Sequence, residues 1–337
     1  MNNAKIERNI TLDCYKCILA ILVVMFHVLQ SSVSDQSNIL YNIIWAIQMP
    51  GFMVVSGYFA CRSITSKYQY KVHILKNIKR YFIPLISWFV FVDIIIEKKY
   101  NSSIYDGLEI LINHVDIGLW FLWVIFVLSI VADTINYFRY HFSGLYKYIY
   151  SIVICVLFFA INICVASQYG VKFLGIKYIL YYSVFYGLGY FLRLINIDTN
   201  DYIRKHESLL VFVCAIIFIL IVVNFDLYHI DDNFVGIILR IIAGISGCYF
   251  LYNIVKRYQT YLIKLNAPKI GRYTFEIYVT HVHVVGLLNI NKLFSLNTIP
   301  GLLTFCVAFL FTMVITIVLI AIIKSIPVIN QMLFGKS

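Results

Sequence analysis

The sequence predicts an all-α polytopic integral membrane protein with about ten transmembrane helices and both termini in the cytosol. Of its 337 residues, 61% are hydrophobic and 13% are charged, and the mean hydropathy is +0.85. Soluble proteins carry about 25% charged residues, so this chain has too little polar surface to be one of them. Apolar runs recur along its whole length, and we expect a single transmembrane domain over 1–337 with no soluble domain.

Ten apolar segments are long enough to cross a hydrocarbon core, which is about 30 Å thick and takes roughly 20 helical residues. In chain order they cover 10–31, 40–61, 80–97, 117–137, 147–167, 173–194, 207–225, 234–255, 270–290 and 298–323. Residues 62–79 have the composition of an amphipathic cytosolic link, and residues 104–114 that of a short helix on the outer surface.

The first segment carries Asp13, Lys16 and His27, and helical geometry places all three on one face. At about 100° per residue, the eleven steps from Lys16 to His27 end about 20° from whole turns and cover about 16 Å along the axis. Ionisable groups in a spanning helix usually face a bundle interior or a wet cavity. The alternative is a lysine that snorkels at the helix end and a histidine satisfied in the core.

The second segment contains Pro50 and Gly51, which loosen a helix, followed by Ser56 and Gly57. Small residues allow close backbone approach in membrane bundles, so helix packing explains this pair as well as a catalytic role for Ser56 does.

A basic run with Lys76, Lys79 and Arg80 leads into the third segment. Pro84 comes four residues after the end of this run. It is either a solvated loop of the positive-inside type or a site for a phosphorylated cytosolic ligand, because Lys and Arg pair well with phosphates.

The fourth segment opens with the aromatic stretch 118–123, which is typical of a membrane interface. Length and apolar composition alone predict the fifth, sixth, seventh and tenth segments.

Arg240 lies inside the eighth segment, where it either snorkels or serves a function. The ninth holds Glu276, His281 and His283. His281 can line the same cavity as His27, although one sequence does not show that they meet.

Lysine and arginine residues are concentrated in alternate loops, which sets the orientation. With the N-terminus inside, the outer segments hold only Lys98, Lys99, Lys172, Lys177 and Lys292. Both termini are therefore expected in the cytosol. The net charge of +11 follows from this asymmetry, so we expect no nucleic-acid partner.

The eight cysteines fall mostly inside apolar runs and are expected to act as small hydrophobic residues. Cys14 and Cys17 form a lone CxxC pair without the strand-to-helix context of a redox motif, and no metal site is expected.

Five features, taken together and in order, resemble the membrane-bound acyltransferase family 3, whose members are integral-membrane O-acyltransferases of surface glycans. They are Asp13-x-x-Lys16, Lys16-x10-His27, Met49-Pro50-Gly51-Phe52 with Ser56-Gly57-Tyr58, the basic run before Pro84, and Ile277-Tyr278-Val279-Thr280-His281. The resemblance covers the whole chain. Two departures are Lys76-x-x-Lys79 in place of an R-x-x-R pair, and Gly51 where a bulky apolar residue is usual.

The resemblance implies an acyl-CoA donor, usually acetyl-CoA, and an acceptor hydroxyl on a sugar of a cell-surface polysaccharide or its lipid-linked precursor. It implies a multi-pass protein of the cell membrane, and the Ile-, Asn-, Lys- and Tyr-rich composition suits a bacterium. His27 would act as general base or as a transient acyl carrier. Its orienting residue would be Ser56, Arg240 or His281. The donor side would include Asp13, Lys16, Lys76, Lys79 and Arg80.

A membrane transporter that exports a glycan or a lipid-linked sugar is the alternative, with the buried His, Arg and Glu as a relay. The sequence shows no duplicated halves and no matching pair of interrupted helices, which favours the enzyme. A structural or sensory protein has no positive feature in its support. The acyl chain and the oligomeric state are not indicated.

Overall fold

The computed structural model describes residues 9–35, 38–96, 104–113, 115, 119–197, 200–288, 290 and 292–336. These residues form helices and connecting turns, with no strand among them, so the all-α prediction is confirmed for this part of the chain. Lys98 and Lys99 of the predicted outer segments, and Gly118 of the aromatic stretch, lie outside the described residues.

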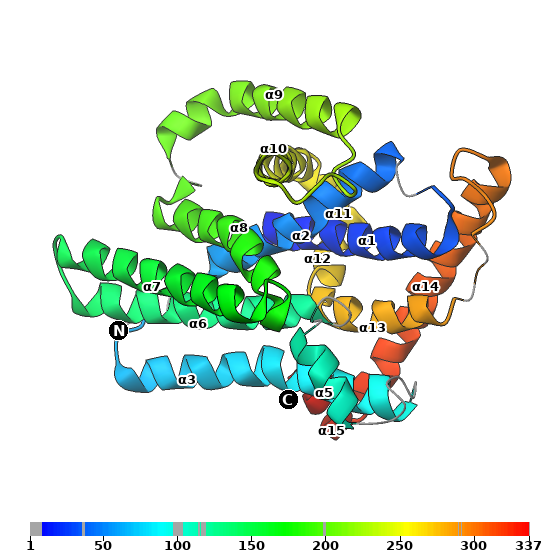
Figure 1. The fold of residues 1–337 in the computed structure, drawn as a ribbon. Coiled ribbons are helices and arrows are strands. Elements are labelled where there is room, and N and C mark those ends of the chain that lie inside the picture. Colours follow the sequence, from blue (N-terminus) through cyan, green and yellow to red (C-terminus); the bar gives the residue numbers. More distant parts are fainter. Residues whose placement is uncertain are drawn as a thin grey trace. The chain divides into compact units, whose positions relative to one another are not determined.

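Seven described helices are long and apolar enough to cross a membrane, so the chain is a multi-pass membrane protein. They are α1 (Ile10–Ser32), α2 (Ile39–Ala60), α6 (Trp120–His141), α7 (Tyr146–Tyr169), α9 (Asp201–Asn224), α10 (Phe234–Arg257) and α14 (Ile299–Ser325). Each corresponds to one predicted segment (Figure 1).

The other three predicted segments fold differently from a single long apolar helix. The third is a succession of the π-helix η1 (Ile78–Phe82), α4 (Ile83–Ser87) and the π-helix η2 (Trp88–Ile96). The sixth is a short 3₁₀ turn followed by α8 (Ile176–Leu194). The ninth is α13 (Thr274–Gly286), and its 13 residues cover only about 20 Å. The count of ten spans therefore stays a prediction.

The chain divides into two compact units; two of the divisions fall inside α2 and α14, and the third lies between α8 and α9. The first unit holds residues 1–55 and 198–321, and the second holds 56–197 and 322–337.

In the first unit, α1 packs against α10, α11 (Gln259–Lys264), α12 (Ala267–Ile270) and α13. Side chains around much of its circumference are buried, among them Cys14, Leu19, Val24, Val28 and Leu29. A Cβ on Gly271 would lie 2.0 Å from the Asp13 carbonyl oxygen, so this glycine allows the segment between α12 and α13 to touch the first turn of α1. That close crossing places α13 beside α1.

In the second unit, α6 packs against α3 (Lys67–Asn77), η1, α7 and α8. The end of α2 crosses α8 closely, because a Cβ on Gly57 would lie 1.9 Å from the Tyr186 carbonyl oxygen. The predicted close packing at this glycine is confirmed. Helix α7 buries none of its residues inside the protein, as expected of a helix that faces lipid.

Candidate functional site

Two histidines from distant parts of the chain meet inside the first unit. His27 lies on α1 and His281 on α13, and their ring centroids are 5.2 Å apart with the planes at 51°. His281 is completely buried, whereas His27 is partly exposed. The packing of α13 on α1 thus forms a histidine pair that neither motif could indicate by itself.

The backbone fixes the proton on His281. Its Nδ1 lies 2.8 Å from the Ile277 carbonyl oxygen, one turn earlier on α13. A carbonyl only accepts hydrogen bonds, so Nδ1 must carry the proton, and in the neutral imidazole Nε2 is then an acceptor. That Nε2 is buried and has no hydrogen-bond partner in the structure. Buried polar atoms are normally paired, so this nitrogen is available to a proton of His27 or of a bound substrate.

His27 is bordered on its own helix by Phe26 and Gln30. The Gln30 side chain hydrogen-bonds to His27, and the Phe26 ring meets the imidazole edge-on with centroids 5.5 Å apart. One nitrogen of His27 is therefore engaged by Gln30, and the ring is held between helix neighbours and His281.

Lys16 and Asp13 form an ion pair nearer the start of α1, with 2.7 Å between Nζ and Oδ1. The two residues are three positions apart on the same helix face, a spacing at which opposite charges meet. The Asp13 carboxylate is almost buried, whereas about a fifth of the Lys16 side chain is exposed (22%). The ammonium is thus held at the same end of α1 by the carboxylate and is still accessible to an anion.

Arg240 is buried on α10 and binds the loop that precedes this helix. Its Nε donates to the Leu227 carbonyl at 2.9 Å, a second nitrogen donates to the Ile230 carbonyl, and it forms an ion pair with Asp232. Its guanidinium also lies 5.2 Å from the centroid of the Trp45 ring. These contacts explain a buried arginine as an anchor for the loop, and its predicted role at His27 stays a prediction.

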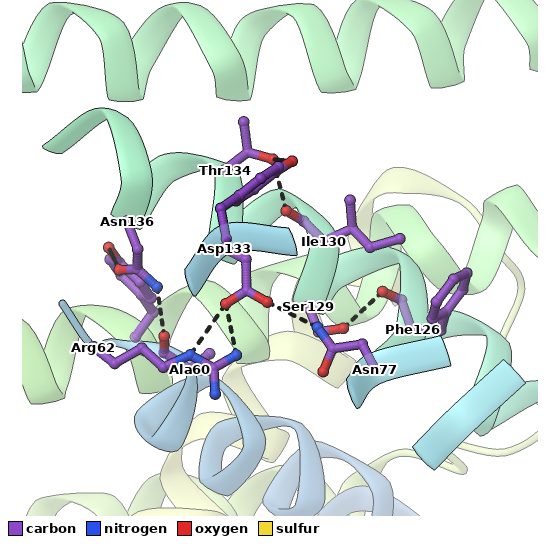
Figure 2. A network of polar contacts seen from close by, with 11 residues as sticks. Ala60, Arg62, Asn77, Phe126, Ser129, Ile130, Asp133, Thr134 and Asn136 are labelled. Atoms are coloured by element: carbon purple, nitrogen blue, oxygen red, sulfur yellow. Dashed lines mark hydrogen bonds and ion pairs between the residues drawn. The ribbon is translucent and has the colours of Figure 1, made fainter. Parts of the chain in front are cut away.

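The basic run of the second unit is anchored by a buried carboxylate. Asp133 on α6 is fully buried and accepts hydrogen bonds from Arg62, at 3.1 and 2.6 Å, and from the Asn77 amide at 2.8 Å (Figure 2). A buried charge is tolerated when it is paired and hydrogen-bonded, and both oxygens of Asp133 are engaged.

This anchor directs the cations of the run outward. Asn77 is buried within the run, whereas Lys76, Lys79 and Arg80 are exposed on either side of it. Lys79 and Arg80 lie in the π-helix η1, and π-helical turns occur frequently at functional sites. The C-terminal segment approaches the same turn, because a Cβ on Gly335 would lie 2.2 Å from the Lys79 carbonyl oxygen.

His73 on α3 lies close to the same network. Partial burial, and then the neighbouring Arg62 charge, lower the pKa of His73 below its ordinary value of 6.5. Both effects disfavour a further positive charge at this point, so the exposed cations of the run carry the charge that an anionic ligand would meet.

Sequence reasoning missed the roles of Arg62, Asn77 and Asp133. The available signal was Asp133, an acidic residue inside an otherwise apolar predicted segment, which should have been treated as a functional or structural candidate. Its two partners come from other elements, and no spacing in the sequence indicates them.

The predicted site residues fall into two groups. Asp13, Lys16, His27, Arg240 and His281 belong to the first unit. The second unit holds Ser56, Lys76, Lys79 and Arg80. Ser56 is partly exposed on α2, one residue beyond the division between the units.

Comparison with known proteins identifies one family. A family model described as an acyltransferase domain, acyltransferase 3, matches residues 9–321 and so spans segments of both units. No curated protein and no solved structure matches the chain.

Proposed function

Because the chain belongs to the acyltransferase 3 family and is a membrane enzyme that transfers acyl groups other than aminoacyl groups, we propose that its donor is acetyl-CoA and its acceptor a sugar hydroxyl. The sugar belongs to a cell-surface polysaccharide or to its lipid-linked precursor. The whole chain then works as one acyltransferase domain in the cell membrane, with both termini in the cytosol.

The observation that carries the chemistry is the pairing of His27 with His281. An acceptor hydroxyl is a weak nucleophile, and a positioned imidazole that takes its proton during attack accelerates such reactions about 10²- to 10⁴-fold. The oxygen forms the new ester bond to the thioester carbonyl carbon, the carbon–sulfur bond breaks, and the proton held by His27 leaves with the CoA thiol. His281 lies against this ring, and its unprotonated Nε2 offers an acceptor to the bound substrate, so the His27 nitrogen that Gln30 leaves free takes the hydroxyl proton.

The same residues also support a two-step route. His27 would attack the thioester first, releasing the CoA thiol and carrying the acyl group on its ring nitrogen. The acceptor oxygen would then attack the acyl-imidazole and lose its proton to the freed nitrogen. Either route needs His27.

The donor's phosphates are assigned to the exposed cations. The charge of CoA lies at one end of a long, thin molecule, and its thioester lies at the other. Lys16 is accessible about 16 Å from His27 along the same helix, and Asp13 holds its ammonium in place. Lys76, Lys79 and Arg80 offer further cations for phosphate.

The test is mass spectrometry of the host's surface glycans in the wild type, a gene deletion, and the deletion complemented with wild-type or His27→Ala protein. We expect an ester-linked acetyl group to disappear in the deletion, to return with the wild type, and to stay absent with His27→Ala at equal membrane levels of protein. His281→Phe, which keeps a ring in the buried site, should restore only a small part of the acetylation.

Two outcomes would contradict the proposal. If His27→Ala restores acetylation, His27 is not the catalytic residue. If the deletion leaves acetylation unchanged but strands the glycan inside the cell, the protein exports the glycan and His27 belongs to a transport pathway.

A further inference from the structure

The loop between α9 and α10 is held rigidly beside the histidine site. Besides the three contacts from Arg240, the buried Asn42 side chain donates to the carbonyls of Val222 and Phe225, and it accepts from the Leu227 amide at 2.8 Å. Leu227 itself is completely buried. A loop fixed at so many backbone groups presents its remaining side chains in defined positions.

The side chain that this loop presents toward His27 is Tyr228. Its ring meets Phe26 at 6.3 Å and Tyr41 at 5.1 Å between centroids, and Phe26 and Tyr41 are 4.6 Å apart. The Gln30 amide donates to the Tyr228 hydroxyl at 3.4 Å. Since Gln30 also hydrogen-bonds to His27, a continuous polar row runs from the imidazole through the amide to the phenol.

This row is accessible and carries no net charge. His27, Gln30 and Tyr228 are all partly exposed, in contrast to the buried His281. Arg240 pairs with Asp232, and the Asp226 carboxylate contacts the His229 imidazole at 2.9 Å. An amide and a phenol beside aromatic rings suit a neutral polyhydroxylated ligand, whose hydroxyls hydrogen-bond and whose C–H faces pack on the rings. They do not suit a phosphate.

We propose that Gln30 and Tyr228 bind the acceptor sugar and present its reacting hydroxyl to His27. The inference rests on the proposed acyl transfer and adds to it the acceptor side of the site. Donor and acceptor then approach His27 with different recognition chemistry, cations for the CoA phosphates and an uncharged aromatic and amide surface for the sugar.

The experiment measures two properties of the full-length protein. The first is the ester-linked acetyl content of the surface glycan when each variant complements the deletion. The second is the thermal stabilisation of the detergent-purified protein by acetyl-CoA. Tyr228→Ala and Gln30→Ala should lower the acetyl content about tenfold, and Tyr228→Phe should lower it by a smaller factor. The stabilisation by acetyl-CoA should match that of the wild type in all three.

Tyr261→Ala is the matched control, because Tyr261 is an exposed tyrosine of the same unit on α11. It should change neither property. Wild-type acetyl content in Tyr228→Ala overturns the inference, as does a parallel loss of acetyl content and acetyl-CoA stabilisation. If Tyr228→Ala does not fold, Tyr228→Phe serves as the test, because it keeps the ring and removes only the hydroxyl. A wild-type protein that neither restores acetylation nor responds to acetyl-CoA contradicts the proposed function instead.

Discussion

At the scale of single residues, the buried ionisable groups differ in how they are satisfied. Asp133 has both oxygens engaged and Arg240 binds two carbonyls and a carboxylate, so the structure explains each without a ligand. His281 is equally buried but leaves Nε2 without a hydrogen-bond partner. An unsatisfied buried group lowers stability, and it persists most readily where function needs it.

The Arg62–Asp133 pair predicts an asymmetry between two substitutions. Arg62→Ala leaves a fully buried carboxylate without its cation and should lower the free energy of unfolding by about 3 kcal/mol. Asp133→Ala frees an arginine whose side chain is already 35% exposed and can reach water, so its cost should be only about 1 to 2 kcal/mol. Thermal unfolding in detergent measures both, and Asp133→Leu with Arg62→Met should recover much of the loss. Equal losses in the two single variants would contradict this account of the pair.

Part of the site was predictable at this scale. The spacing of Asp13, Lys16 and His27 on one helix is a property of local geometry, and it held because α1 is a continuous helix. The meeting of His27 with His281 was not predictable, since it depends on how two helices pack. Asp133 was missed because its partners reside on separate elements.

At the scale of the elements, the long apolar helices were predictable because length and composition alone determine them. The exceptions have local causes. Helix α13 begins late because its approach to α1 needs the turn at Gly271, which lies against the Asp13 carbonyl. The π-helices η1 and η2 change the register of backbone hydrogen bonds, and a hydrophobic pattern does not report that change.

Helix crossings give a prediction with an internal control. Gly57→Ala places a methyl group against the Tyr186 carbonyl oxygen, so it should destabilise the protein by about 1 to 3 kcal/mol. Gly187→Ala, at the residue directly after Tyr186 on α8, meets nothing within 4 Å and should be neutral or gain up to about 1 kcal/mol, because alanine favours a helix. Thermal unfolding of the two variants measures the difference. If the two variants unfold alike, close packing at Gly57 does not contribute to stability.

At the scale of the whole molecule, the described helices establish a multi-pass membrane protein, and the family match spans residues in both units. The orientation is a separate matter, because hydropathy gives no direction and only the distribution of lysine and arginine does.

The charge distribution predicts where the C-terminus lies. A green fluorescent protein fused after Ser337 should fluoresce in a bacterial host, whereas alkaline phosphatase at the same position should be inactive, since the first folds in the cytosol and the second needs the outer compartment. The reverse pattern would place the basic run at the outer face, where cytosolic acetyl-CoA does not reach it.

The lipid-facing character of α7 has a practical consequence. Because this helix buries none of its residues inside the protein, its apolar side chains can be exchanged for one another with little effect on folding. Cys164 is exposed on this helix, as Cys306 is on α14, whereas Cys14, Cys17 and Cys248 are buried. A fluorophore attached there would report on the surrounding bilayer, its thickness and its fluidity, without entering the histidine site.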